Sequence, residues 1–501
     1  APMTIAPDET NAARTGFVHL HLHSEYSLLD GGNRVKDLVE HVKALGMDAV
    51  AVTDHGNLHA AAEFYLAARE VGIKPILGIE AYVAPDSRLT REQTDGPDGG
   101  FHLVLLAENR TGWQHLMKLS SDAFLQGFYR KPRMDRTTLA QWSDGLIAIN
   151  GHLGSSIAHH LTRYVRTEDP ASWDAALEEA RWHAATFGVN ERGEPRFYVE
   201  LQRHDVEDQD AINPHLVRLA EELDLPLVCD NDAHFLRRED WDAHDTLCCI
   251  SMQKVKSDPE RLHYSRELYV KSPDEMADRF ADLPEAMANT VKIAERCDVE
   301  LDFGANHAPV VYVKGPFDTL PDDAPQAHEL LAAYDSPHPP GSTEWYKAVS
   351  AAFSLEPVET DDDSVTPEEL TARCDGALRL IAEAGAIWRY GPDGITPEVR
   401  ERLDRELRIL SEKLISAYFL ICWDCVNWAR QRGIPANARG SGVGTMVGYV
   451  LGLSNACPVE YGLLFERFTD PDRTEYPDID IDICQDGRAD CIEYVRQKYG
   501  H

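Results

Sequence analysis

The sequence predicts an α/β protein whose first part is a seven-stranded (β/α) barrel. Short β-branched runs alternate there with amphipathic stretches, a pattern typical of parallel sheets. The count of seven predicted strands favours a barrel over an open sheet. Residues able to bind metal ions also recur at the strand ends, which a barrel brings together at one mouth.

The first part of the chain carries all of these strands. They are predicted at 18–23, 49–53, 76–80, 102–107, 145–150, 197–202 and 225–231. Helices are predicted between most of them, at 35–45, 60–71, 112–125, 173–187 and 208–223. A further helix is expected near 285–297. We therefore expect a lead-in without order at 1–15 and a barrel domain at 16–285.

The remainder, 286–501, is predicted to form a second domain. Its stretch 315–367 is rich in Pro, Asp and Ser, includes Asp361-Asp-Asp, and reads as an acidic, partly flexible insertion. Thr396 and Pro397 are typical of an N-cap and a first helical turn, so a long helix should begin there. A second helix at 417–432 should stop at Gly433.

Composition limits the classes of protein. No apolar run approaches the ~20 residues of a membrane span, and 1–15 has no signal-peptide core, so we expect a cytoplasmic protein without a membrane partner. Cys422 and Cys425 form a C-x-x-C in an apolar helix, where buried thiols are favoured over a zinc or redox site. The net charge of −36 argues against a simple basic DNA-binding module. Bound metal ions, however, bring their own positive charge to phosphates.

Three histidines alternate with leucines at the first predicted strand. His19, His21 and His23 should share one face of the strand, with the leucines on the other. Three imidazoles on one face are costly to bury unless something binds them, and imidazole is a common metal ligand.

Other ligand-type residues stand at the ends of the other strands. They are Asp30, His55, Glu80, His152, Asp232 and His234, together with His102, which begins its strand. N and O ligands without thiolates suit two or three ions of zinc, manganese or iron that share bridging carboxylates. Such clusters activate water and clamp phosphates, so the set predicts hydrolysis of a phosphate ester.

A second constellation lies near the end of the sequence. Arg439-Gly-Ser441 forms a glycine-rich turn before a helix, where backbone N–H groups and the guanidinium could meet a phosphate. A plain helix entry without a ligand is the alternative for this turn. Further on, Asp478, Asp480 and Asp482 alternate with isoleucines on a predicted strand. Like charges in a row destabilise a strand unless cations or solvent screen them. The pattern indicates a two-metal phosphoryl-transfer site, with an exposed edge strand as the alternative.

These motifs resemble a known family. His21-Leu-His23, Thr53-Asp-His55-Gly-Asn, Gly78-Ile-Glu80, Phe101-His102-Leu and Asn231-Asp232-Ala-His234 resemble the polymerase and histidinol phosphatase (PHP) domain at the head of bacterial DNA polymerase III alpha subunits. The resemblance implies a distorted seven-stranded (β/α) barrel with a three-metal site for Zn²⁺ or Mn²⁺. The ligands that it implies are His21, His23, Asp30, His55, Glu80, His102, His152, Asp232 and His234. His152 is a departure, because many members carry cysteine there. His19 would support the ligands.

The second constellation is similar to the palm of C-family replicative polymerases, which has the nucleotidyltransferase fold of polymerase beta. The resemblance implies that Asp480 and Asp482 are catalytic and bind Mg²⁺, that Asp478 supports them, and that Gly440 and Ser441 hold the triphosphate. Asn437 and Ala438 depart from the usual Pro-Gly. In the family a third catalytic carboxylate lies further downstream, so we expect a fragment that is inactive as a polymerase.

The resemblance implies a DNA-directed DNA polymerase of chromosomal replication. The full-length protein would bind primer–template DNA and deoxynucleoside triphosphates, and would meet the sliding clamp and other replisome subunits through later regions. The barrel would act as a metal-dependent 3′–5′ proofreading exonuclease. The alternative is a barrel in which metals only stabilise the fold and the surface recruits a partner. A free-standing small-molecule phosphatase is disfavoured, because it would leave the palm motifs without a purpose.

Overall fold

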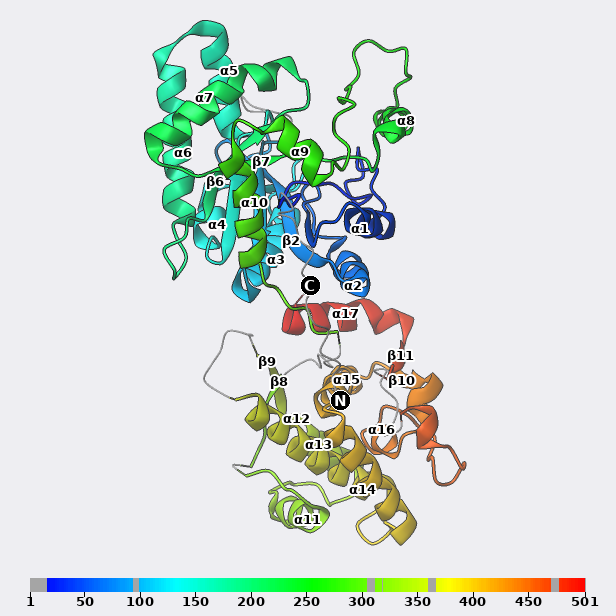
Figure 1. Cartoon of the computed structure of the whole chain (residues 1–501). Coiled ribbons are helices and arrows are strands. Elements are labelled where there is room, and N and C mark those ends of the chain that lie inside the picture. Colours follow the sequence, from blue (N-terminus) through cyan, green and yellow to red (C-terminus); the bar gives the residue numbers. More distant parts are fainter. Residues whose placement is uncertain are drawn as a thin grey trace. The chain divides into compact units, whose positions relative to one another are not determined.

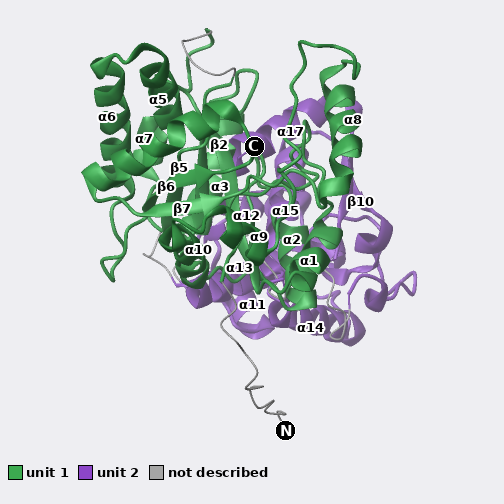
Figure 2. Cartoon of the chain, turned by 45° about the horizontal axis from the view of Figure 1, so that its top comes forward, with its two compact units in different colours: residues 1–301 green, residues 302–501 purple. Residues whose placement is uncertain are grey.

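The computed structural model describes residues 16–92, 99–303, 311–317, 319–358, 366–469 and 477–500. The chain forms two compact units, which end and begin at Leu301 and Asp302 (Figure 2). The expected lead-in at 1–15 and Asp361-Asp-Asp lie outside the described residues. Among the described residues, no helix is both long and apolar enough to cross a membrane.

The first unit is built around a curled seven-stranded sheet (Figure 1). Its strands are β1 Ala49–Val52, β2 Lys74–Val83, β3 Phe101–Ala107, β4 Arg133–Met134, β5 Leu146–Asn150, β6 Phe197–Gln202 and β7 Leu227–Asp230. The order is β1-β2-β3-β5-β6-β7, and the short β4 pairs with the end of β2. Six of these strands match predicted ones, whereas β4 was not predicted.

The expectation of a parallel sheet is wrong for one strand. β3 runs antiparallel to both of its neighbours, β2 and β5, while β1–β2, β5–β6 and β6–β7 are parallel. A reversed strand begins at the edge where parallel strands end. This direction explains why His102, at the beginning of β3, reaches the same edge as ligands that end their strands.

The predicted first strand, 18–23, is extended chain that lies between the two edge strands. On one side the N–H groups of Ala51 and Thr53 donate to its carbonyls, and on the other the N–H of His23 donates to the Ala233 carbonyl. The side chain of Asp230 accepts from the N–H groups of Leu20 and His21, at 2.7 and 3.0 Å. A carboxylate thus takes bonds that a neighbouring strand would otherwise make, and no regular ladder forms.

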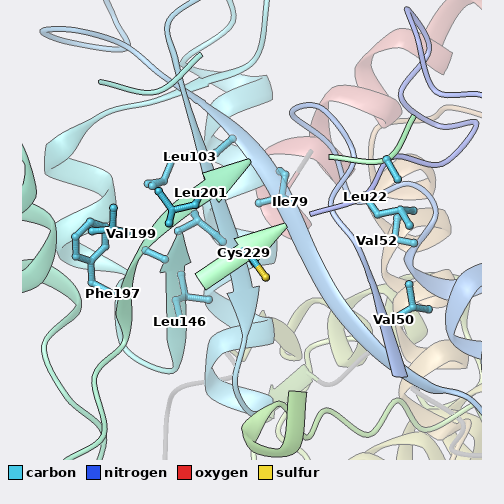
Figure 3. Packing of buried hydrophobic residues seen from close by; sticks show 14 of the residues in the cluster. Leu22, Val50, Val52, Ile79, Leu103, Leu146, Phe197, Val199, Leu201 and Cys229 are labelled. Carbon is cyan, nitrogen blue, oxygen red and sulfur yellow. The ribbon is translucent and has the colours of Figure 1, made fainter. Parts of the chain in front are cut away.

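The two faces of the sheet carry different apolar layers. The outer face packs against the helices, and Val50, Ile79, Leu103, Leu146 and Val199 mark it (Figure 3). The inner face is a smaller cluster to which the alternating residues of the same strands contribute, namely Ala51, Ile76, Val104, Ile147, Tyr198 and Val228. The same alternation along β2 and β6 places Glu80 and Glu200 on the inner face. These carboxylates therefore lie next to the apolar residues of that face.

Helices surround this sheet. They are α1 Val35–Ala44, α2 Ala61–Val71, α3 Arg110–Leu125, α4 Arg136–Gln141, α5 Ser156–Thr167, α6 Pro170–Phe187, α7 Glu207–Leu223, α8 Trp241–Met252, α9 Pro273–Arg279 and α10 Pro284–Arg296. Ile293 and Ala294 of α10 join the inner apolar cluster, and Asn289 donates to the Leu227 carbonyl of β7. The first unit therefore extends past the expected boundary at 285.

The second unit is mostly helical. Its elements are β8 Val311–Lys314, α11 Ala324–Ala333, α12 Thr343–Ala351, β9 Ser354–Pro357, α13 Pro367–Tyr390, α14 Pro397–Glu412, α15 Ser416–Gln431, β10 Ala436–Arg439, α16 Met446–Val450, β11 Asp480–Ile483 and α17 Gln485–Tyr499. Thr396 caps α14 as predicted, by accepting from the Val399 N–H. β8 pairs with β9, and β10 pairs with β11, both antiparallel.

The stretch 315–367 differs from the flexible insertion that the composition predicts. Its described part contains α11, α12 and β9, and Trp345, Tyr346 and Val349 are almost fully buried in the core of the second unit. Their i, i+1, i+4 spacing gives α12 one apolar face. Pro and Asp residues at the helix starts and turns dominated the composition and concealed this pattern.

Candidate metal centre

Glu80 lies at the centre of the predicted ligands, which all gather at one edge of the curled sheet. Its Oε1 is 2.8 Å from His102 Nδ1 and 2.9 Å from His152 Nε2. Its Oε2 is 3.5 Å from His23 Nε2 and contacts His55 Nδ1. Oε1 also lies 3.4 Å from His21 Nε2, so a single carboxylate that is 2% exposed faces five imidazoles.

Asp232 is a second shared carboxylate. Its Oδ1 lies 3.0 Å from His23 Nε2, 3.3 Å from His21 Nε2 and 3.5 Å from His234 Nδ1. The backbone of Asp232 has φ 47°, a left-handed conformation that is uncommon for a residue other than glycine. Such outliers persist where the surroundings hold them, and they cluster at functional sites.

Asp30 completes the set from the loop after His23. Its Oδ1 is 3.5 Å from His55 Nε2, and its Oδ2 accepts a hydrogen bond of 2.6 Å from the Tyr264 hydroxyl. The structure thus brings all nine predicted ligand residues together, from segments that span 21–234 of the sequence.

Eight of the nine residues, all but Asp30, form overlapping groups suited to cations, and Glu200 joins one of these groups. Ligand atoms lie within 4.8 Å of one another in each of four groups: His23, His55 and His234; His21, His23 and Asp232; His55, Glu80 and His102; and His21, His152 and Glu200. Groups that share members fit neighbouring ions with bridging carboxylates.

Buried polar atoms that have no hydrogen-bond partner indicate whether a cation fits the site. Eight of the nine residues have one, namely His21 Nε2, His23 Nε2, Asp30 Oδ1, His55 Nδ1, Glu80 Oε2, His152 Nε2, Asp232 Oδ1 and His234 Nε2. A buried polar atom left without a partner costs about 1–3 kcal/mol. Buried, unpartnered N and O atoms gathered at one edge of the sheet are what a set of metal ligands requires, so these residues fit the ions that the fold family implies.

In several of the histidines the ring nitrogen opposite the site is held by the protein. Nδ1 of His21 lies 2.9 Å from Glu200 Oε1, and Nδ1 of His234 lies 2.8 Å from the Asp232 carbonyl oxygen. An acceptor at Nδ1 places the proton there and leaves the lone pair of Nε2 directed into the site. Partners of this type orient metal-binding imidazoles.

Ser27 and Asp54 perform the same task for His23. The Ser27 hydroxyl donates to Asp54 Oδ1 at 2.7 Å, so it accepts from His23 Nδ1 at 2.9 Å and from the His55 N–H at 3.1 Å. One hydroxyl therefore orients two histidines. Asp54 also accepts from the N–H and the hydroxyl of Ser24.

Glu200 is a site residue that the sequence analysis missed. It is fully buried on β6, and its two oxygens join His21 to His152, with Oε2 at 3.3 Å from His152 Nδ1. Gln202, two residues on, donates to Glu200 at 2.8 Å. The available signal was one acidic residue inside an apolar strand. Tyr264 was also missed, and no local pattern marks it.

The electrostatic surroundings shift the pKa values of the site residues in different directions. Burial opposes ionisation of Glu200, but His21 and His152 outweigh it and lower its pKa to about 2. Burial also opposes protonation of His21, yet Asp232 and Glu200 hold the pKa of His21 well above its usual value. For His23, burial and the neighbouring His55 and His234 lower the pKa to about 3. Histidines of the same site therefore differ strongly in pKa.

His19 lies apart from the other histidines. Its Nε2 is 2.9 Å from the Lys271 carbonyl oxygen, and its Nδ1 is 3.8 Å from Asp230 Oδ1. The prediction that three histidines share one face is therefore wrong for His19. The bonds that Asp230 makes to the backbone on either side of Leu20 interrupt the regular alternation, and Leu20 and Leu22 fall into different apolar clusters.

The second predicted constellation lies on a two-stranded antiparallel sheet in the second unit. Arg439 on β10 is paired with Asp480 on β11, and its guanidinium lies 3.5 Å from Asp480 Oδ2 and 3.2 Å from Asp482 Oδ1. Asp478 precedes β11 and is exposed. Gly440 has φ 67°, which begins the turn that carries Ser441. The predicted residues of this constellation therefore lie close together, with the guanidinium of Arg439 between the carboxylates of Asp480 and Asp482.

The C-x-x-C sequence lies on α15 of this unit. Both thiols are free, Cys422 is buried and Cys425 is partly buried. Burial raises the pKa of Cys422 to about 12, which suppresses the thiolate that a metal or a redox partner needs.

Comparisons with known sequences also divide the chain into two parts. The PHP domain profile matches residues 19–204, and the profile of the bacterial DNA polymerase III alpha NTPase domain matches residues 376–501. The first unit, which we call the barrel unit, is thus an α/β domain of the PHP class, with the nine predicted ligand residues at one edge of its sheet. The whole chain belongs to the family of bacterial DNA polymerase III alpha subunits.

The relatives are similar along almost the whole chain. DNA polymerase III subunit alpha of Borreliella burgdorferi is 39% identical over 97% of this chain, and that of Treponema pallidum is 37% identical over 98%. The chain spans 37% and 36% of the length of these relatives. An amidohydrolase structure from Chromobacterium violaceum, 14% identical over 44% of this chain and 88% of its own, has a TM-score of 0.26, too low to carry an argument.

Proposed function

We propose that the barrel unit hydrolyses phosphodiesters with metal ions held by the nine residues at its mouth. The observation that carries this proposal is the convergence of eight buried N and O atoms without hydrogen-bond partners. Bound ions of zinc or manganese would lower the pKa of a water molecule and clamp the phosphate for in-line attack. The buried carboxylates and the fixed imidazoles supply the negative charge and the lone pairs that hold such ions.

The chemistry proposed is a 3′–5′ exonucleolytic step. Water attacks phosphorus, the bond between phosphorus and the 3′ oxygen breaks, and the proton passes to that oxygen. The products are a nucleoside 5′-monophosphate and a strand with a new 3′ hydroxyl. Nδ1 of His21, His23 and His234 is held by a partner in each case, so Nε2 is the atom left to face an ion, and the role of these residues is to bind and orient.

The experiment is release of nucleotides from a 3′-labelled oligonucleotide with Mn²⁺ or Zn²⁺. We expect His55→Ala to abolish release and to lower the metal content measured by mass spectrometry. His263→Ala is the matched control, since His263 is half exposed and outside the ligand set. Undiminished release by His55→Ala would sink the proposal. Metal-dependent melting without any release would favour the alternative, a metal-stabilised platform that recruits a partner.

We infer that the second unit supplies part of a polymerase-beta-like palm in the full-length protein. Asp480 and Asp482 would hold Mg²⁺, and Gly440 and Ser441 would hold the triphosphate of a deoxynucleotide paired to primer–template DNA. Arg439 now lies between the two carboxylates, and exposed pairs of this kind are weak, worth about 0–1 kcal/mol. Ion binding would therefore release Arg439 toward the triphosphate.

This second proposal is tested on the full-length protein. Asp480→Asn should abolish primer extension and leave nucleotide release by the barrel unchanged. The sliding clamp and other replisome subunits are the partners we propose for the full-length protein. A location in the cytoplasm, where a bacterial chromosome is replicated, follows from the same proposal. Retention of primer extension by Asp480→Asn would overturn the assignment of the palm.

A further inference from the structure

A tight loop lies against the mouth of the barrel, between α3 and β4. We call residues 127–131 the cationic loop. Within it the Tyr129 N–H donates to the Lys131 carbonyl at 3.1 Å, and Arg130 has φ 62°. A non-glycine residue held in this left-handed conformation stores strain, which is a reason to ask what the loop does.

The loop is fixed directly beside the ligands. β4, which follows it, pairs with Tyr82 and Val83 just beyond Glu80. A Cβ atom added at Gly56, next to His55, would lie 2.9 Å from Cγ of Pro132. The chain around the loop therefore touches two segments that carry predicted ligands.

Lys131 reaches from the loop toward the mouth. Its Nζ lies 5.3 Å from the centroid of the Tyr82 ring. That ring is 5.0 Å from the ring of His102 and 6.1 Å from the ring of His55. Only one aromatic ring thus separates the ammonium group from the ligand set. An adjacent phosphate of a bound strand would find a positive charge there.

The charge of this segment is opposite to that of the chain. Residues 127–136 carry four cationic side chains and one carboxylate, in a protein whose net charge is −36. Arg133 is 4% exposed, and its guanidinium donates to the carbonyls of Gly127, Arg88 and Thr90. None of these three partners is a carboxylate, so the buried charge contributes to a positive potential. Phosphates are attracted to such a region.

Exposed aromatic side chains continue from the loop. Phe128 is 50% exposed and Phe124 is 40% exposed, and their rings lie 6.3 Å apart at an angle of 27°. The Phe124 ring is 5.9 Å from the ring of His59, four residues after His55. These rings offer flat apolar faces beside a cationic group. Unpaired bases stack on such platforms whatever their sequence.

We propose that Phe124, Phe128 and Lys131 bind single-stranded DNA at the mouth of the barrel, an inference that rests on the proposed hydrolysis of phosphodiesters. The two phenyl rings stack unpaired bases, and the ammonium group of Lys131 contacts the phosphate next to the one at the ligand set. Bases inside a duplex already stack on each other and cannot use the rings. The substrate class is therefore an unpaired strand end.

The test measures binding and hydrolysis separately. Binding of a fluorescent oligothymidylate is followed by anisotropy in EDTA over a range of salt. Phe128→Ala should weaken binding about tenfold, and Lys131→Met should lower the salt slope by about one. Val189→Ala and Lys292→Met are the controls, because Val189 is 59% exposed outside the patch and Lys292 lies on α10. Neither control should change binding.

Hydrolysis is measured with Mn²⁺ on the oligothymidylate and on a small aryl phosphodiester without a base. The Phe128→Ala and Lys131→Met proteins should show a raised KM for the oligonucleotide and unchanged turnover of the small ester. Oligonucleotide binding that is unaffected by both substitutions overturns this inference. So does equal binding of blunt duplex, or an equal loss with the small ester. Failure of hydrolysis with all proteins contradicts the proposed function instead, while the anisotropy result still decides the binding site.

Discussion

Glu200 Oε1 lies 2.9 Å from Nδ1 of His21, and the other oxygen of the same carboxylate lies 3.3 Å from Nδ1 of His152. One fully buried acidic residue on β6 thus holds two predicted ligands that are far apart in sequence. Both contacts are on the ring edge that faces away from the ligand set. Glu200 therefore determines which nitrogen of each imidazole is available to a cation.

Replacing Glu200 with glutamine should weaken metal binding. The amide keeps one acceptor oxygen, but its NH₂ group faces the second imidazole as a donor, so one histidine loses its orientation. Loss of such a partner lowers metal affinity about 10- to 100-fold. Competition with a zinc chelator measures this directly. Glu178→Gln, an exposed position on α6, is the control and should leave the affinity unchanged.

Gly151→Ala should damage the site through the backbone. The residue has φ 158°, and an added Cβ would lie 2.2 Å from the Glu200 carbonyl oxygen. Because the clash is with backbone, either β6 or the segment that carries His152 must move. Overpacking of this type costs about 1–3 kcal/mol. Thermal melting and metal content should both fall.

Gly193→Ala separates packing from backbone preference. Gly193 also has a positive φ, 76°, but nothing lies within 4 Å of an added Cβ. We expect a modest loss of stability there, about 1 kcal/mol, and full metal content. Equal metal content in the Gly151→Ala and Gly193→Ala proteins would contradict the clash argument.

Asp424→Asn should loosen the helix that follows the aspartate strand. Asp424 on α15 accepts from the hydroxyls of Tyr494 and Tyr499 and from Lys498 Nζ, at 2.7–2.9 Å. Hydrogen bonds to charged groups are worth about 1.5–3 kcal/mol. Faster hydrogen exchange in α17 is therefore expected, with α13 unchanged.

The matched control for Asp424 is Glu493→Gln on α17. Glu493 is about half exposed, and its partners are at the surface, namely Arg496 at 3.5 Å and the side-chain amide of Gln497, which donates to it at 2.9 Å. Such pairs contribute about 0–1 kcal/mol. If the Asp424→Asn protein and this control exchange at the same rate, Asp424 does not anchor α17.

Glu383 should make the second unit sensitive to acid. Burial opposes its ionisation, but His328 and Arg400 outweigh burial, so the pKa of Glu383 lies below its usual value. A group whose pKa is lower in the folded state stabilises the fold at pH above its unfolded pKa, about 4.3. That stability is lost as the pH falls through the folded pKa.

Glu383→Gln removes this contribution. The difference in free energy of unfolding between the two proteins should be largest near pH 7 and should shrink below about pH 4.3. Urea unfolding at several pH values, followed by a labelling pulse at one fixed pH, reports on peptides of α13. Glu401→Gln, at an exposed position on α14, should show a difference that does not vary with pH. A constant difference for Glu383→Gln would contradict the linkage.

Local patterns were sufficient to predict that the nine ligand-type residues lie close together. Imidazoles and carboxylates stood at strand ends, and the structure brings them to one edge. Glu200 was not predicted because a single acidic residue within an apolar strand has no repeating pattern. The direction of β3 was not predicted because the alternation of side chains along a strand is the same in both directions.

Other differences arose from side chains that act in place of backbone. The bonds from Asp230 to the N–H groups of Leu20 and His21 depend on residues about 210 positions away, which no local window contains. In the second unit, α12 was missed because prolines and aspartates around it outweighed its few large apolar residues. The palm architecture stays a prediction, since β10 and β11 form a sheet of only two described strands.

The reversed direction of β3 affects how the opening of the barrel can change. In a wholly parallel barrel each repeat places one connection at the mouth and one at the base. Because β3 runs the other way, the segments on both sides of it, including 84–92 and 127–132, reach the mouth. Insertions in this one part of the gene would therefore reshape the opening and leave the ligand strands in place. It is the natural position at which to graft new recognition loops or a reporter of bound strand.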